Sequence, residues 1–167
     1  MFNELTQKDI DKMNEEIDYR ITVLRPQISQ EIIEAKAQGD LSENAEYHAA
    51  RKAKGRNESR IEYLKSMIKT AKIVKPENEK SDEVGLFDKV EVFFADEGTT
   101  ETIRLSTIMR NDASKGIISK ESPFGKAVLG KKVGDRVKIV VSENYSYEVV
   151  IKSIVKSNGE DIDLPII

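Results

Sequence analysis

Apolar residues in the first part of the chain recur every three or four positions. The run consists of Ile10, Met13, Ile17, Ile21, Leu24, Ile28, Ile32 and Ala35. This spacing places the side chains on one stripe of an α-helix, with the repeat of a coiled coil. Pro26 lies inside the run, and because the stripe continues on both sides we expect a kink or a missing hydrogen bond there, not the end of the helix.

A second helical stripe follows a break at residues 39–40. Its members are Ala45, Ala49, Ala53, Ile61, Leu64, Ile68 and Ala71. Two stripes of similar length joined by a short connection predict an antiparallel helical hairpin, with arms of about 30 residues and roughly 45 Å. The part of the second stripe nearest the break holds only alanine, so we expect small-residue contacts and ion pairs to hold that end.

The apolar period changes to two in the C-terminal part of the chain. We expect strands over residues 89–94, 101–108, 136–141 and 147–155. Ser122 and Pro123 predict the N-cap and first turn of a short helix. The predicted fold class is therefore α+β. An antiparallel coiled-coil hairpin (residues 1–75) with an acidic tip near 39–46 precedes a linker (76–84) and a small antiparallel β domain with one short helix (85–167).

The composition supports this division and excludes several kinds of site. Of the 167 residues, 38% are hydrophobic and 34% are charged, which suits a long solvated helical pair with a small core attached. There is no cysteine, and His48 is the only histidine, so disulfides, cysteine-ligated zinc and multi-histidine metal sites are excluded. No apolar run approaches the roughly 18 residues of a spanning helix. We expect a cytoplasmic protein without a membrane partner.

The net charge of −3 conceals a local basic region. Residues 1–75 hold 14 Lys/Arg and 13 Asp/Glu, whereas residues 76–167 hold 13 and 17. An acidic protein is a poor general binder of nucleic acid, but a local patch can contact a few phosphates. The candidates that flank the break are Lys36, Arg51, Lys52 and Arg56. The alternative is an ordinary solvated helix face.

Two acids, Asp40 and Glu43, lie three residues apart at the break. One interpretation is a capping box, in which Asp40 caps the second helix and Glu43 reaches back to it. The other is a pair of carboxylates presented at the tip of the hairpin. Mg²⁺ typically takes one or two protein carboxylates and keeps several waters, so two acids could complete a metal site whose other ligands belong to a partner.

Three segments resemble one protein family. The run from Gly39 to Arg51, with the sequence GDLSENAEYHAAR, resembles the signature of the GreA/GreB family of bacterial transcript-cleavage factors, most closely the GreA type. The segments SPFGKA, which begins at Ser122, and LGKKVGD, which begins at Leu129, resemble the second domain of that family. The resemblance implies an FKBP-like second domain that docks at the secondary channel of RNA polymerase through Ser122, Pro123 and Phe124.

The same resemblance implies a mechanism. The hairpin would enter the channel, where Asp40 and Glu43 would help to hold a Mg²⁺ of the polymerase and orient the attacking water. The polymerase would then hydrolyse the 3′ end of a backtracked transcript by two-metal chemistry. The chain would bind no Mg²⁺ alone and would not itself be an enzyme. Its partners would be RNA polymerase and the nascent RNA, and we expect a monomer because the hairpin covers its own apolar stripe.

The chain departs from the family pattern in residues 105–113, at Lys54 and residues 57–59 of the hairpin, and in the tail, residues 157–167. The divergent segment 105–113 leaves open a Gre-like inhibitor that plugs the channel, although the intact pair Asp40 and Glu43 argues against it. A prolyl isomerase is a second alternative and needs an aromatic-lined pocket. The aromatic residues available for one are Phe87, Phe93, Phe94, Phe124, Tyr145 and Tyr147. A plain coiled-coil scaffold, the third alternative, predicts that changes at the tip have no effect.

Overall fold

The computed structural model describes residues 3–75 and 81–162. It divides into two compact units, one built mainly from Lys8–Lys72 and the other from Glu4–Gln7 and the chain from Ile73 onward. The predicted linker lies partly outside the described residues, and its boundaries stay a prediction. Within residues 3–75 and 81–162, no helix is long and apolar enough to cross a membrane.

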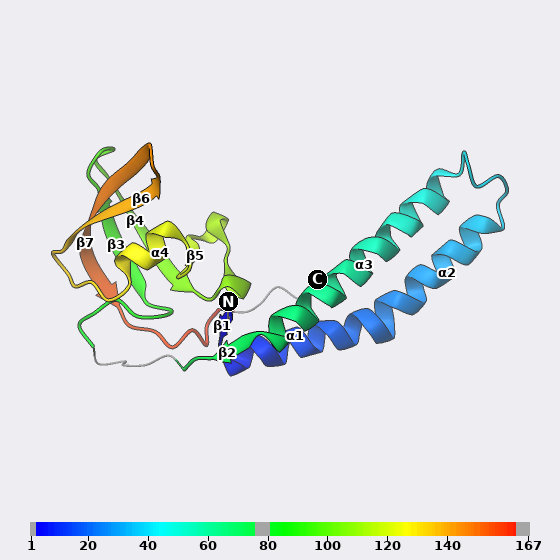
Figure 1. Ribbon diagram of the computed structural model, residues 1–167, viewed down its shortest axis with the longest axis horizontal. Helices are drawn as coiled ribbons and strands as arrows, with labels where there is room; N and C mark the ends of the chain where they lie inside the picture. Colours follow the sequence, from blue (N-terminus) through cyan, green and yellow to red (C-terminus); the bar gives the residue numbers. More distant parts are fainter. Residues whose placement is uncertain (1–2, 76–80, 163–167) are drawn as a thin grey trace. The chain divides into compact units, whose positions relative to one another are not determined.

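The first unit is a helical hairpin, as the stripes predict (Figure 1). Its first arm comprises α1 (Gln7–Tyr19), a π-helical turn (Arg20–Leu24) and α2 (Arg25–Lys36), and its second arm is α3 (Ala45–Lys69). Two short strands, β1 (Asn3–Leu5) and β2 (Ala71–Ile73), precede and follow the hairpin in the sequence and pair with each other.

The π-helical turn explains how the first arm continues through Pro26. In this turn the N–H of Arg25 donates to the carbonyl of Arg20, five residues earlier. Pro26 therefore enters at the first turn of α2, where the missing N–H of a proline is tolerated. The expected local change in hydrogen bonding is present, and it takes the form of a π-helical insertion.

The predicted stripe on α3 is wrong in its alanine-rich half. Ala45 and Ala49 are exposed, whereas Ala50 is buried. The buried residues of α3 are Ala50, Asn57, Ile61, Leu64 and Met67. The pattern of apolar residues missed this face because one of its members is polar: Asn57 faces the first arm and is hydrogen-bonded there.

The described part of the second unit contains a five-stranded sheet, one short α-helix and two 3-10 turns, Ile108–Arg110 and Ala113–Lys115, between β4 and β5. The strands and the α-helix are as follows. In chain order these are β3 (Lys89–Phe94), β4 (Thr99–Ser106), β5 (Ile117–Ser119), α4 (Pro123–Val128), β6 (Arg136–Ser142) and β7 (Tyr145–Val155). The spatial order is β5-β4-β3-β7-β6, and every pair is antiparallel except β4 and β5. The α+β class is confirmed, but the sheet is mixed because β5, too short to be predicted as a strand, joins it in parallel.

Helix α4 begins as the sequence predicts. Ser122 is its N-cap and accepts a hydrogen bond from the N–H of Gly125 at 3.0 Å, and Pro123 occupies the first turn. The side chains of Phe124 and Val128 belong to the core of the sheet. A Cβ at Gly125 would lie 2.6 Å from the Cα of Lys120, so only glycine allows α4 to approach the preceding loop this closely.

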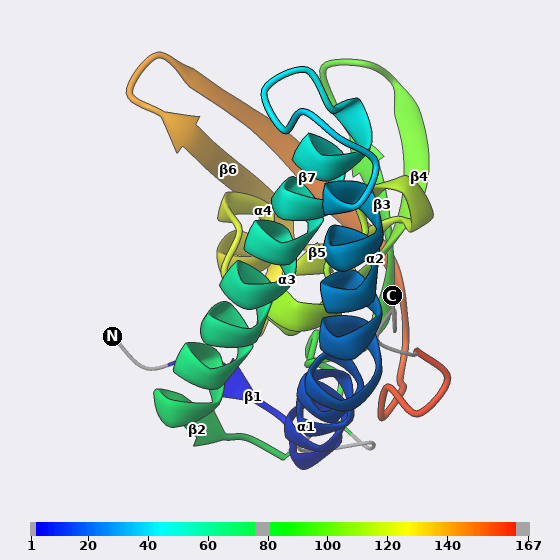
Figure 2. The same cartoon turned by 90° about the vertical axis from the view of Figure 1, so that its right-hand side faces the viewer.

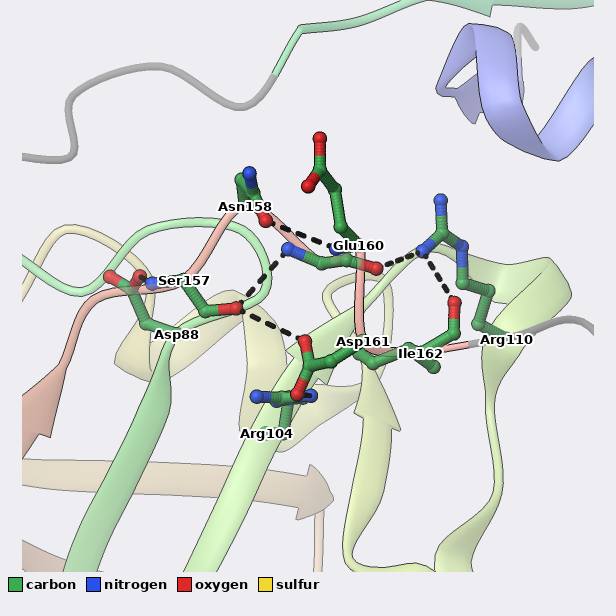
Figure 3. Close-up of polar contacts among 9 residues, drawn as sticks. Asp88, Arg104, Arg110, Ser157, Asn158, Glu160, Asp161 and Ile162 are labelled. Atoms are coloured by element: carbon green, nitrogen blue, oxygen red, sulfur yellow. Dashed lines mark hydrogen bonds and ion pairs between the residues drawn. The ribbon is translucent and has the colours of Figure 1, made fainter.

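The segment after β7, residues 156–162, is fastened to the sheet, and we call it the C-terminal strap (Figure 3). The buried Arg110 donates through Nη1 to the carbonyls of Gly159 at 2.8 Å and Ile162 at 3.1 Å. Its guanidinium also lies 4.5 Å from the centre of the Phe87 ring. Arg104 pairs with Asp161 at 2.8 Å. Residues 105–113 and the described part of the tail, residues 157–162, both depart from the family pattern, and they therefore contact each other through Arg110.

Candidate functional site at the hairpin tip

Residues 37–44 form the loop that joins α2 to α3 (Figure 1). Gly39 turns the chain with a φ of 124°, a conformation that glycine adopts readily. Asp40 Oδ1 then accepts two hydrogen bonds from Ser42, one from the backbone N–H at 3.0 Å and one from the hydroxyl at 2.9 Å. Asp40 thus closes a turn within the loop.

The capping-box interpretation of Asp40 and Glu43 is wrong. The N-cap of α3 is Asn44, whose Oδ1 accepts from the N–H of Tyr47 at 3.0 Å. Its Nδ2 donates to the carbonyl of Ala35 at 2.7 Å, in the last turns of α2. An amide can satisfy a free N–H of one helix and a carbonyl of the other, whereas an ionised carboxylate only accepts.

The two acids of the loop are consequently presented to solvent. Asp40 and Glu43 are both exposed. The hydrogen bonds from the backbone and then the hydroxyl of Ser42 lower the pKa of Asp40 from its ordinary value, which further favours the ionised form. Within the described part of the chain, Glu43 makes no hydrogen bond or ion pair.

Asp40 and Glu43 carry the donor atoms that Mg²⁺ prefers. Carboxylate oxygens are the ligands that Mg²⁺ prefers, and one or two of them commonly suffice when a partner supplies the rest. Among the residues that the structure describes, no three His, Cys, Asp or Glu side chains are grouped so that they could hold a metal ion. That Asp40 and Glu43 share a metal ion with another molecule stays a prediction.

Aromatic and basic side chains surround the loop. His48 Nε2 lies 3.3 Å from the carbonyl of Ser42, and the His48 ring centre lies 5.6 Å from that of Tyr47. Lys36 Nζ lies 6.0 Å from the centre of the Tyr47 ring. These contacts connect the ends of both helices to the loop that carries the acids.

The structure separates the basic residues near the tip into two groups. Lys36, Arg51, Lys52 and Arg56 are exposed, and none of them makes an ion pair within the described residues. Arg60, from the same basic stretch, is instead neutralised by Glu16, with Nε 2.9 Å from Oε1. The four predicted RNA-proximal residues are therefore available to a phosphate, as is Lys54 between them, which is also exposed and unpaired within the described residues.

The predicted docking segment has one freely exposed member. Pro123 is exposed, Ser122 is half-buried and caps α4, and Phe124 is 5% exposed in the core. Docking contacts from this segment would come from Pro123 and the edge of Ser122, with the Phe124 ring supporting them from below.

Sequence reasoning missed a group of four residues inside the hairpin, Glu16, Arg20, Asn57 and Arg60, which we call the polar cluster. Glu16 Oε1 accepts from Arg20 Nε at 2.8 Å and from Arg60 Nε at 2.9 Å. Arg20 Nη1 donates to Asn57 Oδ1 at 3.0 Å, and Asn57 Nδ2 donates to the Arg20 carbonyl at 3.2 Å. Burial would raise the pKa of Glu16, but the hydrogen bonds from Arg60 and Arg20 outweigh it and lower that pKa. The available signal was Glu16 and Arg20 four residues apart on one helix face.

Comparison with known proteins gives matches along both parts of the chain. Residues 3–73 match the family model described as "Transcription elongation factor, N-terminal", and residues 78–156 match "Transcription elongation factor, GreA/GreB, C-term". Transcription elongation factor GreA of Mesoplasma florum is 38% identical over 150 residues, which cover 90% of this chain and 96% of that protein.

Two further matches come from other organisms. Transcription elongation factor GreA of Caldanaerobacter subterraneus subsp. tengcongensis is 40% identical over 139 residues, 82% of this chain and 87% of that protein. A crystal structure of GreA factor homolog 1 from Thermus thermophilus is 22% identical and covers 92% of this chain and 99% of that one, with a TM-score of 0.42.

Proposed function

Since this chain belongs to the GreA/GreB family of transcription elongation factors, we propose that it inserts its hairpin into the secondary channel of RNA polymerase and stimulates cleavage of backtracked RNA. One observation carries the proposal: two exposed carboxylates, Asp40 and Glu43, lie in the loop at the end of a long hairpin. α3 alone has 25 residues and spans roughly 38 Å at 1.5 Å per residue. Such an arm can carry acids to a site that the rest of the chain does not touch.

The residues of the tip have distinct tasks in this proposal. Ser42 holds the Asp40 carboxylate within the loop through two hydrogen bonds and favours its ionised form. Asp40 and Glu43 supply oxygen ligands, and Mg²⁺ shared there with the polymerase would activate water and stabilise the leaving oxygen. Lys36, Arg51, Lys52 and Arg56 attract the phosphates of the RNA 3′ segment, which positions it without reading its sequence.

The hydrolytic site belongs to the polymerase in this proposal, so the chain acts as a cofactor protein and not as an enzyme. Pro123, with Ser122, makes the docking contact at the rim of the channel. The protein works as a monomer in the cytoplasm, where its partners, the polymerase and the nascent RNA, are found.

The test is a backtracked elongation complex of bacterial RNA polymerase with a labelled transcript. Adding the protein should shorten the transcript from its 3′ end, and the variant Asp40→Ala/Glu43→Ala should bind the polymerase but no longer shorten the RNA. Glu31→Ala/Glu62→Ala is a matched control, because it removes two exposed acids of the helices and none at the tip.

Two other results would contradict the proposal. Slower nucleotide addition without shortening would identify an inhibitor that occupies the channel. No effect on either reaction would mean that the fold is shared with the family and the activity is not.

A further inference from the structure

Helix α4 covers only part of the face of the sheet that carries the core. α4 has six residues and β7 has eleven, and Figure 2 shows the β6–β7 hairpin continuing past α4. Side chains alternate along a strand, so Tyr147 lies on the same face as the buried Val149 and Ile151. Beyond the reach of α4, this face ends in aromatic residues.

These aromatic residues form the floor of a pocket of about 210 Å³. It is lined by Phe94, Asp96, Glu97, Tyr145, Tyr147 and Glu148. The rings of Phe94 and Tyr147 are stacked, with centres 6.0 Å apart and planes 27° apart. The ring centre of Tyr145 lies 5.9 Å from that of Tyr147, and Tyr145 is 57% exposed, so it forms the outer wall of the pocket. Burial, and then the neighbouring Tyr145, raises the pKa of Tyr147, which keeps its phenol neutral.

The rim of the pocket is negatively charged. Of its three carboxylates, only Glu148 has a basic partner within the described residues: Arg136 Nη2 lies 2.7 Å from Glu148 Oε2. Asp96 and Glu97 are exposed and make no ion pair in that part of the chain. Aromatic faces also attract positive charge through their quadrupole. Floor and rim therefore favour the same kind of ligand, a cation with a flat face.

We propose that this pocket binds the guanidinium group of an arginine side chain on a partner protein. A guanidinium is planar and stacks on aromatic rings, and its edge can donate hydrogen bonds to a carboxylate. The ring faces of Tyr145 and Tyr147 would receive the plane, and Asp96 with Glu97 would receive the N–H groups. This site lies in the second unit, and its occupation does not depend on the action proposed for the hairpin tip.

The test is a titration of the full chain with arginine amide, followed through the ring resonances of its tyrosines by NMR. Citrulline amide is the neutral isostere, and Tyr63 of the hairpin is the internal reference. Arginine amide should shift the ring resonances of Tyr145 and Tyr147 in a saturable way. Citrulline amide should bind with about tenfold lower affinity. The variant Asp96→Asn/Glu97→Gln should remove that preference, whereas Glu101→Gln, an exposed acid outside the lining, should keep it.

Several outcomes would overturn the proposal. No saturable shift, or equal shifts from citrulline amide, would exclude recognition of the charge. An unchanged preference in the Asp96→Asn/Glu97→Gln variant, with its fold intact by near-UV circular dichroism, would exclude the acidic rim as its cause. A neutral proline-containing peptide that shifted the same tyrosines as strongly would make the pocket a prolyl site instead.

Discussion

Two polar residues of the tip loop, Asp40 and Asn44, have different roles, although aspartate and asparagine are both preferred at the N-cap of a helix. Asn44 joins the two helices, because its amide accepts from α3 and donates to α2. Asp40 is bonded only inside the loop, to Ser42. At the residue scale, Asn44 therefore has a structural role, whereas the Asp40 carboxylate remains available for the role proposed above.

The variant Asn44→Ala tests the structural half of this division. It removes the N-cap of α3 and the bond to Ala35, so it should destabilise the hairpin by about 1–2 kcal/mol. Asp40→Ala should change the stability by a few tenths of that amount at most. Thermal unfolding followed by circular dichroism compares the two, and a larger loss in Asp40→Ala would restore Asp40 as the cap.

The variant Asp40→Asn tests the functional half. Asparagine can still accept the hydrogen bonds of Ser42, so the turn is kept while the charge is lost. If Asp40 acts through its charge, stimulated RNA cleavage should fall by about a hundredfold or more, equivalent to about 3 kcal/mol of transition-state stabilisation. Polymerase affinity, measured in the same complexes, should not change. Full cleavage activity in this variant would show that the charge is not needed.

At the scale of elements, the polar cluster fixes how the two arms of the hairpin meet. Asn57 and Arg20 face each other across the interface and exchange two hydrogen bonds. This contact adjoins the π-helical turn, which begins at Arg20. Removing one partner of a buried ionic group is costly because the remaining charge loses its compensation.

The variant Glu16→Gln should destabilise the hairpin by about 3 kcal/mol, because it leaves Arg20 and Arg60 without their carboxylate. The pH dependence has a definite sign. The pKa of Glu16 is lowered in the folded state, so its contribution is complete above the unfolded pKa of about 4.3 and is lost as the pH falls through the folded value. Urea midpoints measured down from neutral pH should therefore fall more steeply for the natural chain than for the variant. The same pH dependence of the urea midpoint in the natural chain and the variant would contradict this contribution of Glu16.

The C-terminal strap is the second element whose role can be measured. The variant Arg110→Met removes the donor to the carbonyls of Gly159 and Ile162, and should destabilise the second unit by about 2–3 kcal/mol. A chain that stops at Lys156 should lose a similar amount. Because both changes remove the hydrogen bonds between Arg110 and the strap, the double variant should lose less stability than the sum of the two single losses. The loss of stability is measured by amide hydrogen exchange in β4 and β5. Fully additive losses in the double variant would mean that Arg110 stabilises the unit through contacts other than those with the strap.

At the scale of the whole molecule, the proposed action divides between the two units. The hairpin carries the acids, and the second unit carries the exposed Pro123. The variant Pro123→Ala should weaken polymerase binding about tenfold if this residue is a central docking contact. Its cleavage defect should disappear at saturating concentrations of the factor, whereas that of Asp40→Asn should persist. A Pro123→Ala defect that persists at saturation would place this residue in the reaction and not in docking.

The sequence by itself determined the elements and their order. The spacing of apolar residues identified both arms of the hairpin, the four longer strands, and the start of α4 at Ser122 and Pro123, because these features depend on neighbours within a few positions. The tip run and the two C-terminal segments identified the family. The sequence also placed the acids Asp40 and Glu43 at the break between the helices; the capping interpretation was wrong, and their contribution to a metal site stays a prediction.

The tertiary structure decided everything that depends on partners distant along the chain. Asn57 faces inward because Arg20, 37 residues away, bonds to it. Asn44 replaces Asp40 as the cap because its amide also reaches the carbonyl of Ala35, nine residues earlier. Arg110 holds a strap that begins 46 residues later, at Lys156, and β5 becomes a strand only because β4 is beside it. Local periodicity contains no information on such pairs, since a hydrogen bond across the fold depends on where both groups are placed and not on either sequence pattern alone.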